Sequence, residues 1–176
     1  MLKYILFVFL TTLSIYGQSY QTSLLNLHAK VFPKILLSDT QLDEKLVDNN
    51  IVIIILYEEK DLKVAQSFQK RILKYHSQLG IYTFDVLLQK YTSFSSSDNA
   101  TAYYQLLTDA TTLQNTNSII QLKNKISFSY DNSYLDRGTL MSLYIDKKVM
   151  PFIDMKTLKN SKIIFKNIIF KIAKTQ

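Results

Sequence analysis

The chain contains no cysteine and no tryptophan, and of its 176 residues only 3 are glycine and 2 are proline. Without cysteine there can be no disulfide, no thiol nucleophile and no thiolate-bound metal, so the fold must be held by its core alone. The glycines stand at positions 17, 80 and 138, too far apart for a glycine-rich phosphate loop. Arginine is also scarce, because only Arg71 and Arg137 among the 21 Lys and Arg residues are arginine.

The first 19 residues have the pattern of a secretory signal peptide. Lys3 supplies the positive start, an apolar stretch follows at 4–13, and Gly17 and Ser19 frame a cleavage site of small residues. The apolar stretch is shorter than the ~20 residues that span a bilayer, which favours cleavage near Ser19 over retention as a membrane anchor. We therefore expect residues 20–176 to form one exported domain, and the lack of disulfides favours the bacterial periplasm.

The formal net charge of +7 does not by itself indicate nucleic-acid binding. Lysines are spread along the chain, and export makes nucleic acid an unsuitable partner, so we expect none. The C-terminal end is an exception, with lysines at positions 156, 159, 162, 166, 171 and 174. This cluster indicates either the solvated face of a terminal helix or contact with an anionic membrane surface or an acidic partner.

The pattern of apolar residues predicts an α/β fold. Strands are predicted at 51–57, 81–90, 102–107 and 126–129, with a hairpin at 140–145 and 149–153. Helices are predicted at 24–37, 60–76, 108–122 and 164–173. Pro33 should kink or end the first helix near Phe32, and Gly80 should end the second. In the last helix, Ile168 and Ile172 should face the core. This order gives a single-domain Rossmann-like sandwich with a mostly parallel sheet, a C-terminal hairpin and a terminal helix.

Few residues could carry catalysis. His28 is predicted to be a core or boundary residue on an apolar helix face, and His76 to lie at a helix end, where a cation suits the helix dipole. Neither belongs to a His-x-x-x-His arrangement, so we expect no metal site and no cofactor. Glu58 and Glu59 follow a buried strand and could form a catalytic pair, but a solvated loop or a helix N-terminal charge is the favoured interpretation. We therefore expect a protein without enzymatic activity.

One segment after the predicted strand at 126–129 has an unusual signature. It combines aromatic residues and aspartates with an Arg-Gly pair, where glycine permits a positive φ and the planar guanidinium offers donors that lysine cannot imitate. The predicted partner-binding or ligand-binding residues are Tyr130, Asp131, Tyr134, Asp136, Arg137 and Gly138. An alternative for Arg137 is a structural contact with a strand carbonyl or with Asp136. Tyr103 and Tyr104, like Tyr130 and Tyr134, are predicted to be exposed aromatics, which are common in interfaces.

The segment from about Lys125 to Ala173 resembles the C-terminal half of the YfiR-like (HmsC-like) family of periplasmic proteins. In that family a strand ends at an Asp, an aromatic residue and an Arg-Gly pair follow, and a Phe-x-Ile-Asn strand and a Leu-rich helix come last. Asp131 and Arg137-Gly138 match these positions, and 152–154 (Phe-Ile-Asp) replaces the Phe-x-Ile-Asn strand. Thr139 stands where the family has a second glycine, and the cysteines and the Trp-Pro pair of family members are missing.

The resemblance implies a non-enzymatic periplasmic regulator. Well-known members hold an inner-membrane diguanylate cyclase inactive by binding its periplasmic sensor domain, which controls cyclic di-GMP and biofilm formation. The partner that the resemblance implies is the periplasmic domain of an inner-membrane diguanylate cyclase or sensor kinase. Such a regulator is expected to bind its partner, or to form a homodimer, through the surface near Tyr130–Leu140.

A second interpretation is a periplasmic sensor or solute-binding domain with a small-molecule ligand. Residues 127–155 also loosely resemble the last part of periplasmic solute-binding proteins. Those proteins have two lobes and nearly twice this length, and a single lobe cannot close on a ligand. A ligand-dependent rise in melting temperature would distinguish a sensor from a regulator that binds only a protein.

Overall fold

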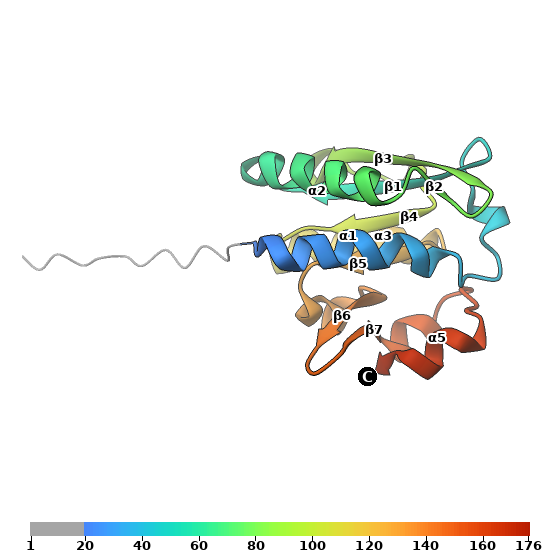
Figure 1. The fold of residues 1–176 in the computed structure, drawn as a ribbon. Helices are drawn as coiled ribbons and strands as arrows, with labels where there is room; N and C mark the ends of the chain where they lie inside the picture. Colours follow the sequence, from blue (N-terminus) through green and yellow to red (C-terminus); the bar gives the residue numbers. More distant parts are fainter. Residues whose placement is uncertain (1–19) are drawn as a thin grey trace, which may run out of the picture.

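A computed structural model describes residues 20–176, and the predicted signal peptide at 1–19 lies outside the described residues. The strands are β1 (Asn50–Tyr57), β2 (Gln78–Leu79), β3 (Tyr82–Lys90), β4 (Ala102–Gln105), β5 (Ile126–Ser129), β6 (Met141–Ile145), β7 (Val149–Ile153) and β8 (Lys174–Thr175). They form one eight-stranded sheet in the order β2-β3-β1-β4-β5-β6-β7-β8 (Figure 1). Strands β3, β1, β4, β5 and β6 pair in parallel, and β7 forms the predicted antiparallel hairpin with β6. The predicted α/β sandwich with a mostly parallel sheet is confirmed.

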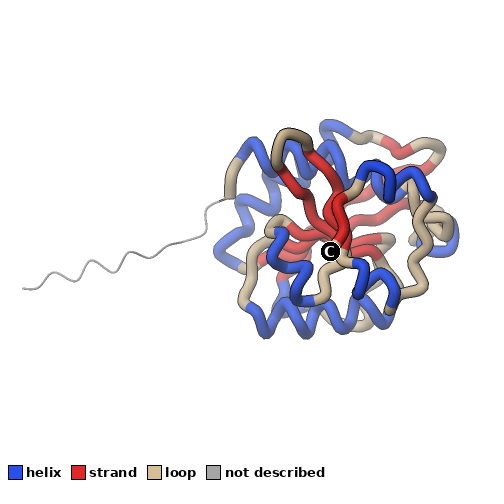
Figure 2. The backbone as a smooth tube through the Cα atoms, turned by 90° about the horizontal axis from the view of Figure 1, so that it is seen from below, coloured by secondary structure: helices blue, strands red, loops and turns tan. Residues whose placement is uncertain are grey.

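Helices cover both faces of the sheet (Figure 2). They are α1 (Thr22–Leu36), α2 (Leu62–Tyr75), α3 (Ala110–Leu122), α4 (Met155–Lys159) and α5 (Asn167–Ile172). Short 3₁₀ turns are η1 (Asp43–Lys45), η2 (Glu59–Asp61), η3 (Tyr91–Ser93) and η4 (Asn132–Arg137). Helices α1, α2 and α5 pack on one face and α3 on the other. Within residues 20–176, none of the helices combines the length and the apolar character that crossing a membrane requires.

Strand β1 is buried on both sides, as its continuous apolar sequence predicts. Successive side chains of a strand point to opposite faces, so β1 contributes to two cores. The odd-numbered residues from Ile51 to Ile55 pack under α1 and α2. The even-numbered residues from Val52 to Leu56 pack with Ile120 of α3. β1 is therefore the centre of the fold.

Helix α1 continues past its proline, so of the two outcomes predicted at Pro33, a kink or an end near Phe32, the end is wrong. The helix runs to Leu36 with Pro33 inside it. Proline has no N–H, so the carbonyl of Ala29 loses its helical donor. The ring nitrogen Nε2 of His76 lies 3.0 Å from that carbonyl oxygen and replaces the missing donor. His76 lies at the end of α2, as predicted, but it is buried, and burial lowers its pKa, so it is a neutral packing residue and not a cation.

Two other predictions about helix ends are wrong. Gly80 does not end α2, but lies with φ +62° in the turn between the antiparallel strands β2 and β3. The terminal helix is reduced to the six residues of α5. Ile168 and Ile172 of α5 are 58% and 52% exposed and do not face the core, whereas Ile169 is buried.

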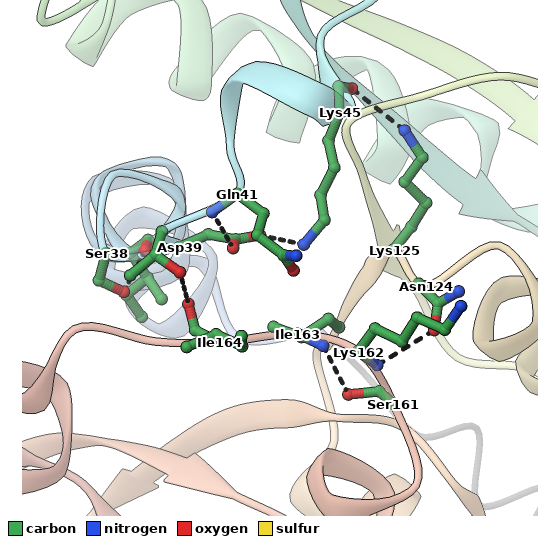
Figure 3. A network of polar contacts seen from close by, with 12 residues as sticks. Ser38, Asp39, Gln41, Lys45, Asn124, Lys125, Ser161, Lys162, Ile163 and Ile164 are labelled. Carbon is green, nitrogen blue, oxygen red and sulfur yellow. Dashed lines mark hydrogen bonds and ion pairs between the residues drawn. The ribbon is translucent and has the colours of Figure 1, made fainter.

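The chain before α5 is held in an extended conformation by the end of α1. The N–H of Thr40 donates to the carbonyl of Ile164 over 2.8 Å, and the N–H of Lys166 donates to the carbonyl of Ser38 over 2.7 Å. Figure 3 shows Ser38 and Ile164 side by side in this junction. Because these backbone groups bond to α1 and the residues that follow it, they cannot make helical hydrogen bonds, and α5 begins late.

A buried ion pair between Asp39 and Lys45 lies beside this junction (Figure 3). The N–H of Gln41 donates to Oδ1 of Asp39 over 3.0 Å. The backbone carbonyl of Lys45 accepts a 3.1 Å hydrogen bond from the ammonium group of Lys125. The network thus joins the end of α1 to the segment that enters β5.

Candidate ligand-binding site at the carboxyl edge of the sheet

The parallel strands all end at one edge of the sheet, which we call the carboxyl edge. After β1 the chain crosses to β3 on one side, whereas after β4 it crosses to β5 on the other side. The point between β1 and β4 is therefore the topological switch point, where open α/β sheets bind their ligands. The loops that follow β1, β4 and β5 meet there.

The switch point is closed by side chains of the protein itself. The hydroxyl of Tyr20 donates to Oδ2 of Asp61 over 3.0 Å and accepts a 2.8 Å hydrogen bond from the N–H of Leu107. The hydroxyl of Thr108 donates to the carboxylate of Glu58. Burial raises the pKa of the Tyr20 hydroxyl, so it keeps its proton and acts as a donor. A ligand at the switch point would have to displace this tyrosine.

An open hollow of about 390 Å³, which we call the edge hollow, lies beside the closed switch point. It is formed by the start of α1, the ends of β4 and β5, and β6. The polar lining residues are Gln21, His28, Tyr130, Asp131 and Asn132. The apolar lining residues are Leu24, Leu107, Leu143 and Ile145. Apolar walls with a few polar groups are typical of small-molecule sites.

His28 is the most deeply buried polar residue of the edge hollow. It is 1% exposed, and its Nδ1 lies 2.6 Å from the hydroxyl oxygen of Tyr104. The rings of Phe32, Tyr104 and Tyr130 surround it, with centroid distances of 4.8, 5.9 and 5.7 Å. Burial penalises the charged imidazolium and lowers the pKa of His28 to about 3. The ring is therefore neutral at neutral pH, and it confirms the prediction of a core or boundary histidine.

Two of the residues predicted from the sequence, Tyr130 and Asp131, line the edge hollow. The ring of Tyr130 lies 4.9 Å from that of Tyr20, and its hydroxyl accepts a 2.7 Å hydrogen bond from the N–H of Gln21. Oδ1 of Asp131 accepts a 2.9 Å hydrogen bond from the N–H of Ser133 and so caps η4. The second carboxylate oxygen of Asp131 has no hydrogen-bond partner in the described part of the chain and can contact a ligand.

A third predicted residue, Tyr134, is part of the core. Its hydroxyl donates to the carbonyl of Thr108 over 2.9 Å and accepts from the N–H of the same residue over 2.7 Å. Tyr103 and Tyr104 are likewise buried, at 0% and 1% exposure, so the prediction that these three aromatics are exposed is wrong. Tyr103 and Tyr104 are buried because β4 is paired on both sides and covered on both faces, which buries all four of its residues.

The remaining predicted residues, Asp136, Arg137 and Gly138, line a different hollow of about 480 Å³, which we call the arginine hollow. Lys156 and Gln176 complete part of its wall. Arg137 is exposed, and its guanidinium makes no hydrogen bond or ion pair with residues 20–176, so it does not tie the loop to a strand carbonyl or to Asp136. Asp136 instead accepts a 3.1 Å hydrogen bond from the side-chain amide of Gln176.

The Arg-Gly turn is fixed by a glycine and by a buried threonine. Gly138 has φ +88°, a left-handed conformation that glycine tolerates, as predicted. Its carbonyl accepts a 2.9 Å hydrogen bond from the side chain of Gln121. The hydroxyl of Thr139 donates to Oε1 of Gln105 over 2.7 Å and accepts from Asn117 over 3.1 Å. The buried Thr139 thus holds this turn against the sheet and α3.

The six predicted residues therefore do not form one site. Two line the edge hollow, one is buried, and three line the arginine hollow. Sequence reasoning missed the roles of His28 and Tyr20, whose partners Tyr104 and Leu107 follow 76 and 87 residues later. The available signal for His28 was a polar residue on the apolar face of a helix, which by itself predicts only a core or boundary position.

A third hollow of about 400 Å³ lies on the α3 side of the switch point. Its carboxylates already have partners, since Glu58 is bound by Thr108 and Asp109 caps α3 through two backbone N–H groups. The neighbouring Glu59 forms an ion pair with Lys90. Among residues 20–176, no group of three His, Asp or Glu side chains is arranged to hold a metal ion.

No family model and no curated protein matches the sequence, whereas solved structures share the fold. A conserved domain protein from Vibrio cholerae O1 biovar El Tor strain N16961 is 12% identical with a TM-score of 0.61, over 86% of this chain and 60% of that one. The ABC domain in complex with L-Trp from Streptococcus pneumonia is 14% identical with a TM-score of 0.52, over 80% of this chain and 60% of that one. At this identity the similarity establishes the fold alone, and the match spans 60% of the length of either structure.

Proposed function

We propose that this chain is a non-enzymatic binding domain that holds a small organic molecule in the edge hollow. The observation that carries the proposal is the convergence of apolar walls from α1 and β6 with the buried imidazole of His28 and the carboxylate of Asp131. The hollow lies at the carboxyl edge, where open α/β folds bind ligands. Its volume of about 390 Å³ falls within the range of small-molecule sites, which is roughly 300–1,000 Å³.

Two observations favour binding over catalysis and over a purely structural role. The carboxylates nearest the switch point already have partners within the protein, since Glu58 accepts from Thr108 and Glu59 pairs with Lys90. The Streptococcus pneumonia domain, which has a similar fold, is in complex with the small molecule L-Trp. By analogy of fold, we infer a ligand of similar size here.

Thermal melting of the purified protein with a collection of small organic molecules tests this function. A ligand that binds only the native state stabilises it by about 2.7 kcal/mol at 100 times its Kd, which raises the melting temperature. Ile145→Trp should fill the edge hollow and abolish the rise, because Ile145 is half exposed and lines the hollow. Its matched control is Leu87→Trp, at a strand residue that is 51% exposed, like Ile145, and lines none of the three hollows. A rise that survives Ile145→Trp, or no rise with any compound, contradicts the proposal.

The second candidate function is regulation of a membrane signalling protein. It is favoured by the resemblance around Arg137 and by the exposed guanidinium of that residue, which has no partner in the described part of the chain. We propose that the protein is exported to the periplasm and that Arg137 contacts the periplasmic domain of an inner-membrane diguanylate cyclase or sensor kinase. Arginine suits this role because its planar fork binds a partner's carboxylate through two hydrogen bonds.

The cellular level of cyclic di-GMP, measured with and without the gene, tests the second candidate. A repressor of a cyclase predicts a rise when the gene is deleted. Arg137→Ala should reproduce the rise with the protein still folded, whereas Lys147→Ala, which removes an exposed cation outside the arginine hollow, should not. If deletion of the gene leaves the cyclic di-GMP level unchanged, a diguanylate cyclase is excluded as the partner.

A further inference from the structure

The proton positions on His28 and Tyr104 follow from their partners. Tyr104 is 1% exposed, and burial raises the pKa of its hydroxyl well above its usual value, so the hydroxyl keeps its proton. A buried hydroxyl proton needs an acceptor, and among residues 20–176 the partner of this hydroxyl is Nδ1 of His28. Tyr104 therefore donates and Nδ1 accepts. Because the imidazole is neutral, its one proton must be on Nε2.

The Nε2–H group of His28 reaches into the edge hollow. It has no hydrogen-bond partner among residues 20–176. Every fully buried side-chain nitrogen and oxygen of the described residues does have a partner, so Nε2 cannot be sealed in the core. The open space that His28 lines is the edge hollow. A donor on a side chain this deeply buried recognises an acceptor oxygen, because leaving it without one is costly once a ligand excludes water.

The charge of the residues that line the edge hollow determines which charged group the ligand can carry. Asp131 is its one charged lining residue, since His28 is neutral and the other lining residues are uncharged. A carboxylate ligand would meet this negative charge without a compensating cation. An ammonium group, in contrast, gains the attraction of the Asp131 carboxylate.

We propose that the edge hollow binds small organic cations that carry an uncharged oxygen, such as amino alcohols with an apolar or aromatic body. The Nε2–H of His28 donates to the ligand oxygen, and the carboxylate of Asp131 binds the ammonium group. The body of the ligand packs against Leu24 and Leu143. This ligand class rests on the proposed small-molecule function and makes it specific.

Three compounds that share a phenyl ring test the ligand class by isothermal titration calorimetry on the purified protein. L-phenylalaninol carries both an ammonium group and a hydroxyl, 2-phenylethylamine carries the ammonium group alone, and 3-phenylpropionate carries a carboxylate. We expect L-phenylalaninol to bind about 5-fold tighter than 2-phenylethylamine, which is the contribution of one hydrogen bond. We expect no binding of 3-phenylpropionate over the same concentration range.

Two variants separate the roles of the two side chains. Asp131→Asn keeps the cap on Ser133, since asparagine also caps helices, but removes the charge. This variant should weaken the binding of both amines about equally, by roughly 10-fold. His28→Asn keeps an acceptor for Tyr104 but is too short to place a donor in the hollow. This variant should abolish the preference for L-phenylalaninol and leave the affinity for 2-phenylethylamine nearly unchanged. If His28 had only a structural role, the substitution would lower the affinity for both amines.

Several results would overturn the proposal. These are binding of 3-phenylpropionate in preference to the amines, equal affinities for the two amines in the unmodified protein, and no binding of L-phenylalaninol. If His28→Asn does not fold, the nitrogen chemical shifts of His28 in the unmodified protein show which ring nitrogen carries the proton. A proton on Nδ1 contradicts the donor assignment, and a proton on Nε2 agrees with it. If other compounds bind and Ile145→Trp abolishes their binding while the amines fail, the ligand class is wrong and the proposed function stands.

Discussion

Removing one partner of the buried ion pair between Asp39 and Lys45 should destabilise the protein much more than removing one partner of an exposed pair. The side chains of Asp39 and Lys45 are 0% and 9% exposed. Asp39→Asn leaves the ammonium group of Lys45 buried without its counter-charge. Lys45→Met leaves the carboxylate of Asp39 with the N–H of Gln41 as its remaining donor among residues 20–176. Either change leaves a buried charge without its partner, which is strongly destabilising.

The expected loss for either single variant is about 3–5 kcal/mol, which is a large part of the roughly 5–15 kcal/mol that stabilises a typical domain. The double variant Asp39→Asn/Lys45→Met has no charge left at this position and should lie within about 2 kcal/mol of the unmodified protein, because replacing a whole buried pair is often nearly neutral. The control is the exposed pair of Glu59 and Lys90, with side chains 70% and 44% exposed. Lys90→Ala should cost at most about 1 kcal/mol.

Equilibrium unfolding in urea, followed by circular dichroism, measures these differences. With a typical slope of about 2 kcal/mol per molar urea, the single variants should lower the unfolding midpoint by about 2 M, and Lys90→Ala by at most about 0.5 M. The slope should stay the same in all variants. The reasoning is refuted if the single variants unfold at the midpoint of Lys90→Ala, or if the double variant loses the sum of the two single losses.

Three further predictions, on the glycines, on pH and on Arg137, test other parts of the structure. Gly138→Ala should cost about 2 kcal/mol in urea unfolding, because its φ is +88° and because the side-chain amide of Gln121, 2.7 Å from the added Cβ, must move and give up its hydrogen bond to the carbonyl of Gly138. Gly80→Ala, at φ +62° with nothing within 4 Å of the added Cβ, should cost about 1 kcal/mol, and equal losses at the two glycines would contradict the steric argument. Stability should fall as the pH drops from 6.5 towards 3, by up to about 1.4 kcal/mol per pH unit, because the unfolded state protonates His28 before the native state does, with its pKa near 3. His28→Asn should flatten this slope between pH 6.5 and 5, and an unchanged slope would show that other groups cause it. Arg137→Ala should change the free energy of unfolding by less than about 0.5 kcal/mol, since its side chain makes no polar contact with residues 20–176, and a larger loss would indicate a structural role.

The parallel sheet could be predicted because its signals are local. The continuous apolar run of β1 identifies a strand buried on both faces, and the apolar face of α2 identifies the helix that follows. Since a strand–helix–strand unit crosses over in parallel, β3 follows beside β1. Neither step needs information from distant residues.

The ends of the helices depended on distant residues, and those predictions failed. Pro33 does not end α1, because His76 of another helix supplies the donor that the carbonyl of Ala29 lacks. The start of α5 is fixed by hydrogen bonds that reach from Ser38 and Thr40 to the other end of the chain. Apolar periodicity contains no information about such contacts, so it extends the terminal helix too far.

The candidate site was predicted in part. The signature after β5 correctly drew attention to Tyr130 and Asp131, because turn residues at the carboxyl edge of a parallel sheet are a general place for ligands. It could not reveal that Arg137, six residues after Asp131, lines another hollow, because η4 lies between them and turns the chain. Nor could it place His28 opposite the signature, since α1 precedes β1 and its position on the sheet is a tertiary property.

The closed switch point and the open edge hollow have one structural cause, which is the position of Tyr20. Its hydroxyl joins the loops after β1 and β4, and its ring packs against Tyr130. This contact brings the start of α1 to the carboxyl edge and fills the usual ligand position. His28 follows eight residues later, inside α1, where its imidazole contacts Tyr104 of β4 and the ring of Tyr130 after β5. The tyrosine that closes the usual ligand position therefore also positions the histidine that lines the hollow beside it.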